Sequence, residues 1–307
     1  MDKIVVITGP TGVGKSELAI QLAKFFNGAI INCDASQIRQ GLNIGTAKID
    51  WQSAPVPHHL FDFLKPDDPF SIKDYQTLAR AKIDELTKAG KTVFLVGGSG
   101  LYIASVIGDY PMEAKSRDPG FGDRFSNLSN EELHSELEKM DLVSAQSIHC
   151  NNRRRVLRAL EVAMQGEKIQ VLREFVPRYQ SLNLCLVCDR PLLYERINQR
   201  VDTMFENGWV DEVSELVQSG VKVSNLQEIG YKEIAGFLQG GQDREPVKDL
   251  IKQKTRNYAK RQMTWFKHKL VCQFVTMDYD EMEKTFQKTS QLISDFLGMD
   301  RRNRETA

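Results

Sequence analysis

The sequence lacks the long apolar runs and the paired cysteines that are typical of membrane and secreted proteins. No stretch approaches the roughly 18 to 20 uninterrupted apolar residues of a membrane span. A strand pattern begins at Lys3, so we expect no signal peptide. The five cysteines are odd in number and scattered, which does not fit a disulfide framework. We therefore expect a cytoplasmic protein with no membrane partner, and we expect it to be a monomer.

Metal-ligand patterns are also scarce. Cys185 and Cys188 have C-x-x-C spacing, but they lie in an apolar, strand-like run and have no second Cys or His pair nearby. His58 and His59 are adjacent, not one helical turn apart, so they make a poor metal pair. We interpret the two cysteines as core residues and expect no zinc site.

Acidic residues are missing from one long window. Lys and Arg balance Asp and Glu at 41 each, yet no acidic residue occurs between Asp249 and Asp278. On a helix, Lys252, Arg256 and Lys260 of this window share one face. That face is either a solvated surface over a buried apolar stripe or a contact for a polyanion. Together with a second basic cluster in the region before it, this face favours a nucleic-acid partner. The second cluster consists of Arg153, Arg154, Arg155 and Arg158.

The sequence does contain a complete phosphate-binding loop. Residues 9–16 read GPTGVGKS and match G-x-x-x-x-G-K-[ST], after an apolar run and before a helical pattern. In such a loop, backbone N–H groups and the helix N-terminus face the phosphates, Lys15 adds a full charge, and Ser16 ligates Mg²⁺. The motif predicts binding of a di- or triphosphate with Mg²⁺ as cofactor. The expected contacts are Gly9, Thr11, Gly12, Val13, Gly14, Lys15 and Ser16.

Strand-like and helical patterns alternate along the chain. We expect strands at 3–8, 29–33, 92–96, 182–188 and 270–276, most of them followed by helical patterns. This alternation predicts an α/β fold, a doubly wound parallel sheet of the P-loop NTPase type with helices on both faces. Ligands then bind at the carboxyl ends of the strands.

We expect a small all-helical insertion in this core. No convincing strand occurs between Pro111 and Ser181, and Ser129 with Glu132 forms a capping box ahead of amphipathic helices. The expected division is a first core part at 1–111, the helical insertion at 112–181, a second core part with the basic helix at 182–298, and a disordered tail at 299–307.

Two strand ends carry groups suited to chemistry. Asp34 follows the second strand, where a carboxylate serves as a metal-positioning group or a general base, or is only a turn or cap residue. The third strand ends in Gly97, Gly98 and Ser99, without the acidic residue of an ATPase. The guanine-reading pattern Asn-Lys-x-Asp is absent. We therefore do not expect an ATPase motor or a GTPase switch.

Several motifs together resemble tRNA dimethylallyltransferase (tRNA isopentenyltransferase) of the bacterial type. The resemblance implies transfer of a dimethylallyl group from dimethylallyl diphosphate to the exocyclic amine of the adenosine immediately 3′ of a tRNA anticodon, with release of pyrophosphate. Besides the phosphate loop, the motifs are residues 34–37 (DASQ), 45–48 (GTAK), 57–60 (PHHL), 97–102 (GGSGLY), 153–161 (RRRVLRALE), 200–204 (RVDTM), 229–233 (IGYKE) and 254–266 (KTRNYAKRQMTWF).

The resemblance also implies roles for single residues. Asp34 is expected to take the amine proton, while Ser99, Arg200, Lys15 and a Mg²⁺ ion on Ser16 stabilise charge on the leaving pyrophosphate. Arg196 lies one helical turn before Arg200, and we expect Arg200 to matter more for transfer. The partner is the tRNA anticodon stem-loop, with its target base flipped out of the stack. Its expected contacts, in the strand-end loop, the insertion and the basic helix, are Asp34, Ala35, Ser36, Gln37, Arg153, Arg154, Arg155, Arg158, Lys252, Arg256 and Lys260.

The chain departs from the family pattern at four motifs, two of them beside the expected catalytic groups, and two other functions stay open. The usual Asp-Ser-x-Gln-x-Tyr reads Asp34-Ala-Ser-Gln-Ile-Arg39, and the usual Gly-Gly-Thr ends in Ser99. A small-molecule or nucleotide kinase with the same loop would consume ATP without requiring tRNA. A nucleotide-gated RNA-binding module would bind tRNA and form no product.

Overall fold

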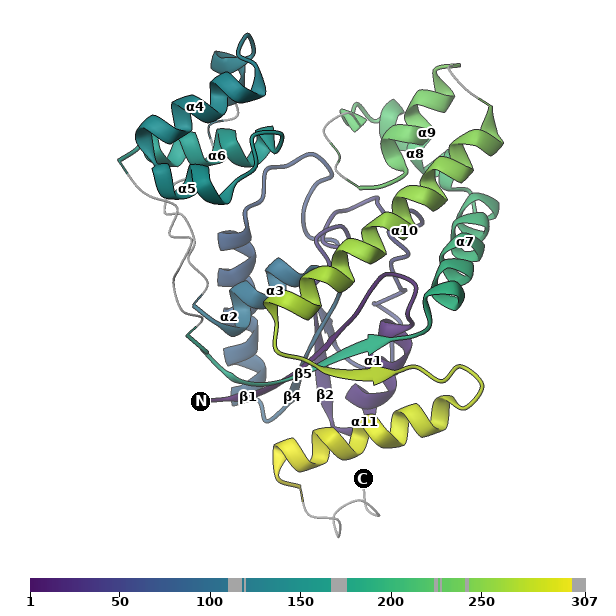
Figure 1. Ribbon diagram of the computed structural model, residues 1–307. Coiled ribbons are helices and arrows are strands. Elements are labelled where there is room, and N and C mark those ends of the chain that lie inside the picture. Colours follow the sequence, from purple (N-terminus) through teal and green to yellow (C-terminus); the bar gives the residue numbers. More distant parts are fainter. Residues whose placement is uncertain are drawn as a thin grey trace. The chain divides into compact units, whose positions relative to one another are not determined.

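The computed structural model describes residues 1–109, 118, 120–166, 176–223, 226, 228–240 and 243–299 (Figure 1). The chain divides into two compact units, Met1–Gly108 with Pro177–Ala307, and Asp109–Val176. The expected helical insertion was 112–181, whereas residues 177–181 belong to the larger unit because they lead into a strand of its sheet. From residue 300 on, the expected disordered tail lies outside the described residues.

The larger unit is built on a six-stranded, all-parallel sheet with the order β3-β2-β4-β1-β5-β6. This sheet, covered by helices, confirms the predicted α/β fold of the P-loop type. The short strand β3 was not predicted and pairs with β2. The strands are β1 (Lys3–Thr8), β2 (Gly28–Asn32), β3 (His58–His59), β4 (Thr92–Val96), β5 (Gln180–Val187) and β6 (Gln273–Thr276).

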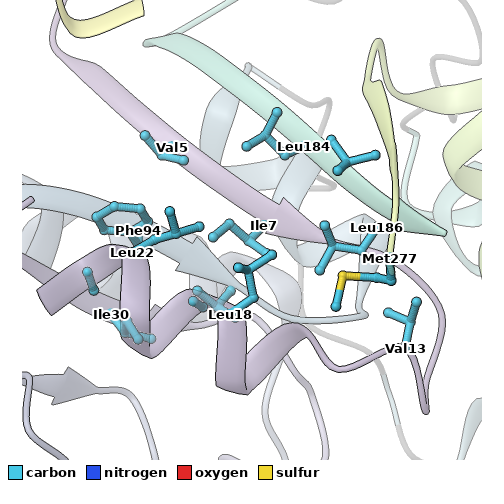
Figure 2. Packing of buried hydrophobic residues seen from close by; sticks show 14 of the residues in the cluster. Val5, Ile7, Val13, Leu18, Leu22, Ile30, Phe94, Leu184, Leu186 and Met277 are labelled. Carbon is cyan, nitrogen blue, oxygen red and sulfur yellow. The ribbon is translucent and has the colours of Figure 1, made fainter. Parts of the chain in front are cut away.

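The central strands are buried on both faces, which explains their nearly continuous apolar sequence. In β1, Val5 and Ile7 pack in one cluster while Ile4 and Val6 pack in another, because successive side chains of a strand point to opposite faces. Figure 2 shows the first cluster, in which Leu18 and other residues of the first helix cover the sheet.

Helices cover the two faces of the sheet. Helices α1 (Lys15–Phe25) and α11 (Met282–Leu297) contribute to the cluster of Val5 and Ile7. Helices α2 (Ile72–Lys88), α3 (Gly100–Ile107) and α10 (Arg244–Lys269) contribute to the other cluster. A third cluster joins one end of α10 to α7 (Arg190–Glu206), α8 (Trp209–Gln218) and α9 (Tyr231–Leu238).

The smaller unit has its own core, with Leu133, Leu137, Val156 and Leu160 among its buried residues. The predicted capping box at its first α-helix is confirmed, since Ser129 and Glu132 each accept a hydrogen bond from the other's backbone N–H. Its described elements are the 3₁₀ helix η1 (Phe121–Phe125) and the helices α4 (Asn130–Met140), α5 (Leu142–Ser147) and α6 (Arg153–Met164).

Among the described helices, none combines the length and the apolar character that a bilayer crossing requires.

Candidate active site at the carboxyl ends of the strands

The phosphate-binding loop joins β1 to α1 and curls as the sequence predicts. Gly12 and Gly14 adopt φ values of 85° and 86°, in the left-handed region that favours glycine. The side chain of Val13 is fully buried in the core beneath the loop. The loop is therefore held by the sheet on one side, and Thr11, Gly12, Gly14, Lys15 and Ser16 line a cavity on the other.

Lys15 is the first residue of α1 and lies at the end of this loop. Its Nζ donates to the carbonyl oxygen of Pro10 at 2.8 Å. Burial lowers the pKa of Lys15 to about 8, against the opposing effect of the Asp34 carboxylate, and the charge of Arg200 lowers it further. A negatively charged ligand would favour the charged form of this buried lysine and be attracted by it.

Asp34 follows β2 and lines the same cavity. The backbone N–H of Asp34 donates to Oδ1 of the buried Asn32 at 2.9 Å. The Asp34 Oδ1 in turn accepts from the N–H of Ser36 at 3.0 Å, which closes a tight turn. Within the described residues the second carboxylate oxygen, Oδ2, accepts no hydrogen bond. The turn therefore fixes the carboxylate and leaves one oxygen available.

Ser99 lies behind this turn and does not line the cavity. Its Oγ accepts from the N–H of Ala35 at 3.0 Å. Tyr258 of α10 lies near Ser99 and lines the cavity. Burial raises the pKa of that tyrosine, and the negative charge of Asp34 raises it further. In this structure Ser99 thus braces the loop that carries Asp34.

Arg200 of α7 points into the cavity, whereas Arg196 does not line it. The guanidinium of Arg200 donates to Oγ1 of Thr11 at 3.4 Å and to the carbonyl oxygen of Thr46 at 3.5 Å. Burial lowers its pKa from the ordinary value, and the Asp34 carboxylate opposes this effect. Arg200, Lys15 and Asp34 therefore surround one space.

That space is a cavity of about 740 Å³ whose walls are partly apolar. All residues that line it belong to the larger unit. Besides the polar groups already described, Ala35, Ser36 and Gln37 line it, and the apolar side chains include Ile20, Ile49, Phe61, Ile197 and Met204. Of the predicted diphosphate contacts, Gly9 and Val13 stay outside the lining. The arrangement suits a ligand with a strongly anionic part and an apolar part.

Two residues that bind the parts of the site together were not singled out from the sequence for this role. Gln262, on the buried face of α10, accepts from the N–H of Thr11 at 2.9 Å and donates to the Gly98 carbonyl oxygen at 3.0 Å. Glu212 of α8 accepts from the N–H groups of residues 43–45 at 2.8, 2.7 and 3.2 Å. For Gln262 the sequence offered one signal, because this polar residue shares a helical face with Ile251 and Phe266.

The predicted basic clusters contain both bound and exposed side chains. In α10, Lys252 pairs with Asp202 at 2.7 Å and Arg256 donates to Asn198 at 2.5 Å, so α7 supplies the partners for both, while Lys260 is exposed. In the smaller unit, Arg153 donates to the carbonyl oxygens of Leu128 and Phe125, and Arg158 pairs with Glu161 at 2.7 Å. Arg154 and Arg155 are exposed.

Comparisons with known proteins agree on one family. Residues 37–269 match the model of the family described as IPP transferase. A tRNA dimethylallyltransferase of Bacillus pumilus is 44% identical over 277 residues, which cover 87% of each chain. One of Bacillus subtilis is 44% identical over 277 residues, covering 87% of this chain and 88% of the relative.

Solved structures give the same result. A tRNA isopentenylpyrophosphate transferase of Staphylococcus epidermidis has a TM-score of 0.73 at 36% identity, covering 96% of this chain and 99% of that chain. A eukaryotic dimethylallyltransferase described as acting on tRNA has a TM-score of 0.84 at 27% identity, covering 97% of this chain and 80% of that chain. The chain therefore belongs to the IPP transferase family.

Proposed function

We propose that this protein transfers a dimethylallyl group from dimethylallyl diphosphate to the exocyclic amine of the adenosine immediately 3′ of the tRNA anticodon, releasing pyrophosphate. The observation that carries the proposal is that the phosphate loop, Asp34 and Arg200 share one cavity with apolar walls. The names of the relatives support the same reaction. No observation favours the kinase or the non-catalytic RNA-binding module.

In this proposal Asp34 acts as the general base. An adenine amine is a weak nucleophile because its lone pair is delocalised into the ring, so its proton must leave as the new carbon–nitrogen bond forms. One carboxylate oxygen of Asp34 is engaged by the Ser36 N–H, and Oδ2 is available to accept that proton. The target base reaches the cavity by leaving its stack in the anticodon loop, at a cost of about a few kcal/mol.

The leaving pyrophosphate is stabilised by fixed donors and cations. As the allylic carbon–oxygen bond breaks, negative charge develops on the bridging oxygen and the phosphates. Lys15, Arg200 and the loop N–H groups surround this position before the substrate arrives, so little reorganisation is needed. Ser99 does not line the cavity, so a direct role in this step requires its hydroxyl to turn towards the substrate. Otherwise Ser99 positions the loop that carries Asp34.

The residues present fit a Mg²⁺ ion that is shared with the donor. Ser16 lines the cavity beside Lys15, and the Asp34 carboxylate lines it as well. The described residues hold no group of three or more His, Cys, Asp or Glu side chains suited to a metal ion. With Ser16 as a protein ligand, the ion would take further ligands from phosphate oxygens and water. When bound, the ion neutralises charge on the diphosphate.

We assign the tRNA contacts of α10 to its exposed cations. Lys260, Arg261 and Lys267 are exposed, and Arg261 also lines the cavity. The expected contacts by Lys252 and Arg256 require these side chains to leave α7 first. In the smaller unit, the exposed Arg154 and Arg155 are better placed for phosphates than Arg153 and Arg158, which hold their own unit together.

A transfer assay tests the proposal. The protein is incubated with Mg²⁺, dimethylallyl diphosphate and unmodified tRNA, and the digested tRNA is analysed by mass spectrometry for N6-isopentenyladenosine. The modified nucleoside should form with wild-type protein and fall to a small fraction with Asp34→Asn. A matched reaction with ATP in place of the donor should yield no phosphorylated product. Absence of the modified nucleoside with folded wild-type protein would exclude the proposed reaction.

A further inference from the structure

Two side chains from distant parts of the chain hold the outer side of the phosphate-binding loop. Arg196 of α7 donates from Nε to the Gly12 carbonyl oxygen at 3.0 Å. Tyr279, which follows β6, donates from its hydroxyl to the Val13 carbonyl oxygen at 3.3 Å. The Arg196 guanidinium lies 4.0 Å from the centre of the Tyr279 ring, so the two side chains also stack on each other.

The carbonyl oxygens of the phosphate-binding loop need hydrogen-bond donors. A loop that turns its N–H groups towards a ligand turns carbonyl oxygens away from it, and these oxygens need partners. Arg196 and Tyr279 supply donors to two consecutive carbonyls, while Lys15 binds that of Pro10. Neither Arg196 nor Tyr279 lines the cavity, so both act on the loop from behind.

The same segment fills the space behind Gly14. A Cβ atom added at Gly14 would lie 3.5 Å from the Met277 side chain and 3.9 Å from that of Tyr279. Met277 is buried in the core beneath the loop, as Figure 2 shows. Residues 277–279 therefore limit how far residues 12–14 can move away from the ligand. This segment lies beyond the residues that match the family model, 37–269.

We propose that Arg196 and Tyr279, here called the outer clasp, are positioning residues that fix the N–H groups of residues 12–14 in the orientation that binds diphosphate. The inference rests on the proposed function because it takes a diphosphate as the ligand of the loop. It assigns Arg196 a role distinct from that of Arg200, which faces the ligand directly. Without the clasp, the loop must be ordered by the ligand, and this cost lowers affinity.

Binding of inorganic pyrophosphate in the presence of Mg²⁺, measured by calorimetry, tests the clasp without requiring transfer. Removing a donor to a carbonyl typically weakens a site by about threefold when it is neutral and about tenfold when it is charged. We expect about tenfold weaker binding for Arg196→Met and about threefold for Tyr279→Phe. Two matched changes on α7, Arg190→Met and Tyr194→Phe, remove similar groups that make no clasp contact and should leave binding unchanged.

Kinetics separate positioning from general loss of structure. In transfer assays the clasp variants should raise KM for dimethylallyl diphosphate, leave KM for tRNA unchanged, and reach close to the wild-type kcat at saturating donor. Combining both substitutions should weaken binding by less than the product of the single effects, because the two side chains support one segment. Tyr279→Phe changes no charge, so its effect cannot arise from lost attraction between Arg196 and the phosphates.

The outcomes distinguish the two hypotheses. If wild-type protein does not bind pyrophosphate, the proposed function fails. If wild-type protein binds it and both clasp variants bind as tightly as the control variants, the clasp inference is wrong while the proposed function stands. If Arg196→Met fails to fold, as judged by circular dichroism, Tyr279→Phe alone decides the matter.

Discussion

At the scale of single residues, a substitution of Asp34 can remove the proposed general base while keeping the turn that this residue forms. Asparagine at this position keeps an oxygen that can accept from the Ser36 N–H, so the turn persists while the base is lost. We expect Asp34→Asn to lower kcat by about 10²- to 10⁴-fold, the usual contribution of a general base. The affinity for tRNA, measured by filter binding, should stay near the wild-type value. Near-wild-type turnover at saturating substrates would show that another group takes the proton.

Lys15 links donor binding to proton uptake. Burial lowers its pKa to about 8, from an ordinary value of 10.5. At pH 8.5 most of the free protein therefore has a neutral Lys15, and a bound diphosphate raises the pKa again and draws in a proton. At pH 6.5 the side chain is already charged, so it takes up none.

Calorimetry in buffers of different ionisation enthalpy measures this uptake. We expect the lysine to add up to about three quarters of a proton to the uptake on pyrophosphate binding at pH 8.5, and almost none at pH 6.5. The variant Lys15→Met corrects for protons taken up by pyrophosphate itself, and in this variant the contribution of the lysine should vanish. Equal proton uptake by wild-type protein and by Lys15→Met at pH 8.5 would contradict a lysine that is neutral in the free site.

At the scale of elements, some cations of α10 have partners on α7 and others are exposed to solvent. Lys252 and Arg256 contact α7, whereas Lys260, Arg261 and Lys267 are exposed. We expect replacing the three exposed residues by Gln to weaken tRNA binding and to flatten the slope of log affinity against log salt. The expected change is about 0.7 to 0.9 per lost phosphate contact. Binding of pyrophosphate should change little unless Arg261 also contacts the donor.

The control for this prediction lies on the same helix. Lys252→Gln with Arg256→Gln removes two cations that already have partners within the protein, so the salt slope should stay at the wild-type value. Binding titrations at several salt concentrations compare the two sets. If the pair flattens the slope and the triple substitution does not, the tRNA contacts lie on Lys252 and Arg256, as the sequence pattern first suggested.

The elements show where sequence-based prediction works and where it ends. The phosphate loop, the five longer strands and the Ser129 capping box depend on local patterns, and all of them are present. The strand β3 has two residues, too few for any period to be visible, and it forms because β2 offers a free edge. The acid that partners Lys252 is Asp202, which belongs to α7 and which no window around α10 contains.

In the site too, features with a local pattern were predicted and contacts between distant residues were not. The phosphate loop was predicted from its complete motif, and Asp34 because strand ends of a parallel sheet meet at one edge. The contact between Gln262 and Thr11 joins residues 251 positions apart, and that of Tyr279 with Val13 joins residues 266 positions apart. Such contacts depend on the packing of α10 against the sheet and on the place of β6 at its edge, which no local pattern encodes. The sequence thus predicts the groups that face the ligand better than the groups that hold them in place.

At the scale of the whole molecule, the two units have separate cores. The buried residues of the smaller unit, such as Leu133 and Leu160, pack among themselves. Every residue that lines the cavity belongs to the larger unit. A ligand of the cavity therefore makes its contacts with the larger unit, and its binding energy should stabilise that unit selectively.

Hydrogen exchange with and without pyrophosphate and Mg²⁺ measures this selectivity. A ligand at about 100 times its Kd stabilises the state that binds it by about 2.7 kcal/mol. We expect slower exchange, by up to about a hundredfold, for amides of α1 and α7 that open only when the larger unit unfolds. Amides of α4 and α6 should exchange at unchanged rates, because their opening does not release the ligand. Equal slowing in both units would show that they unfold together, and the molecule would then behave as one cooperative body despite its two cores.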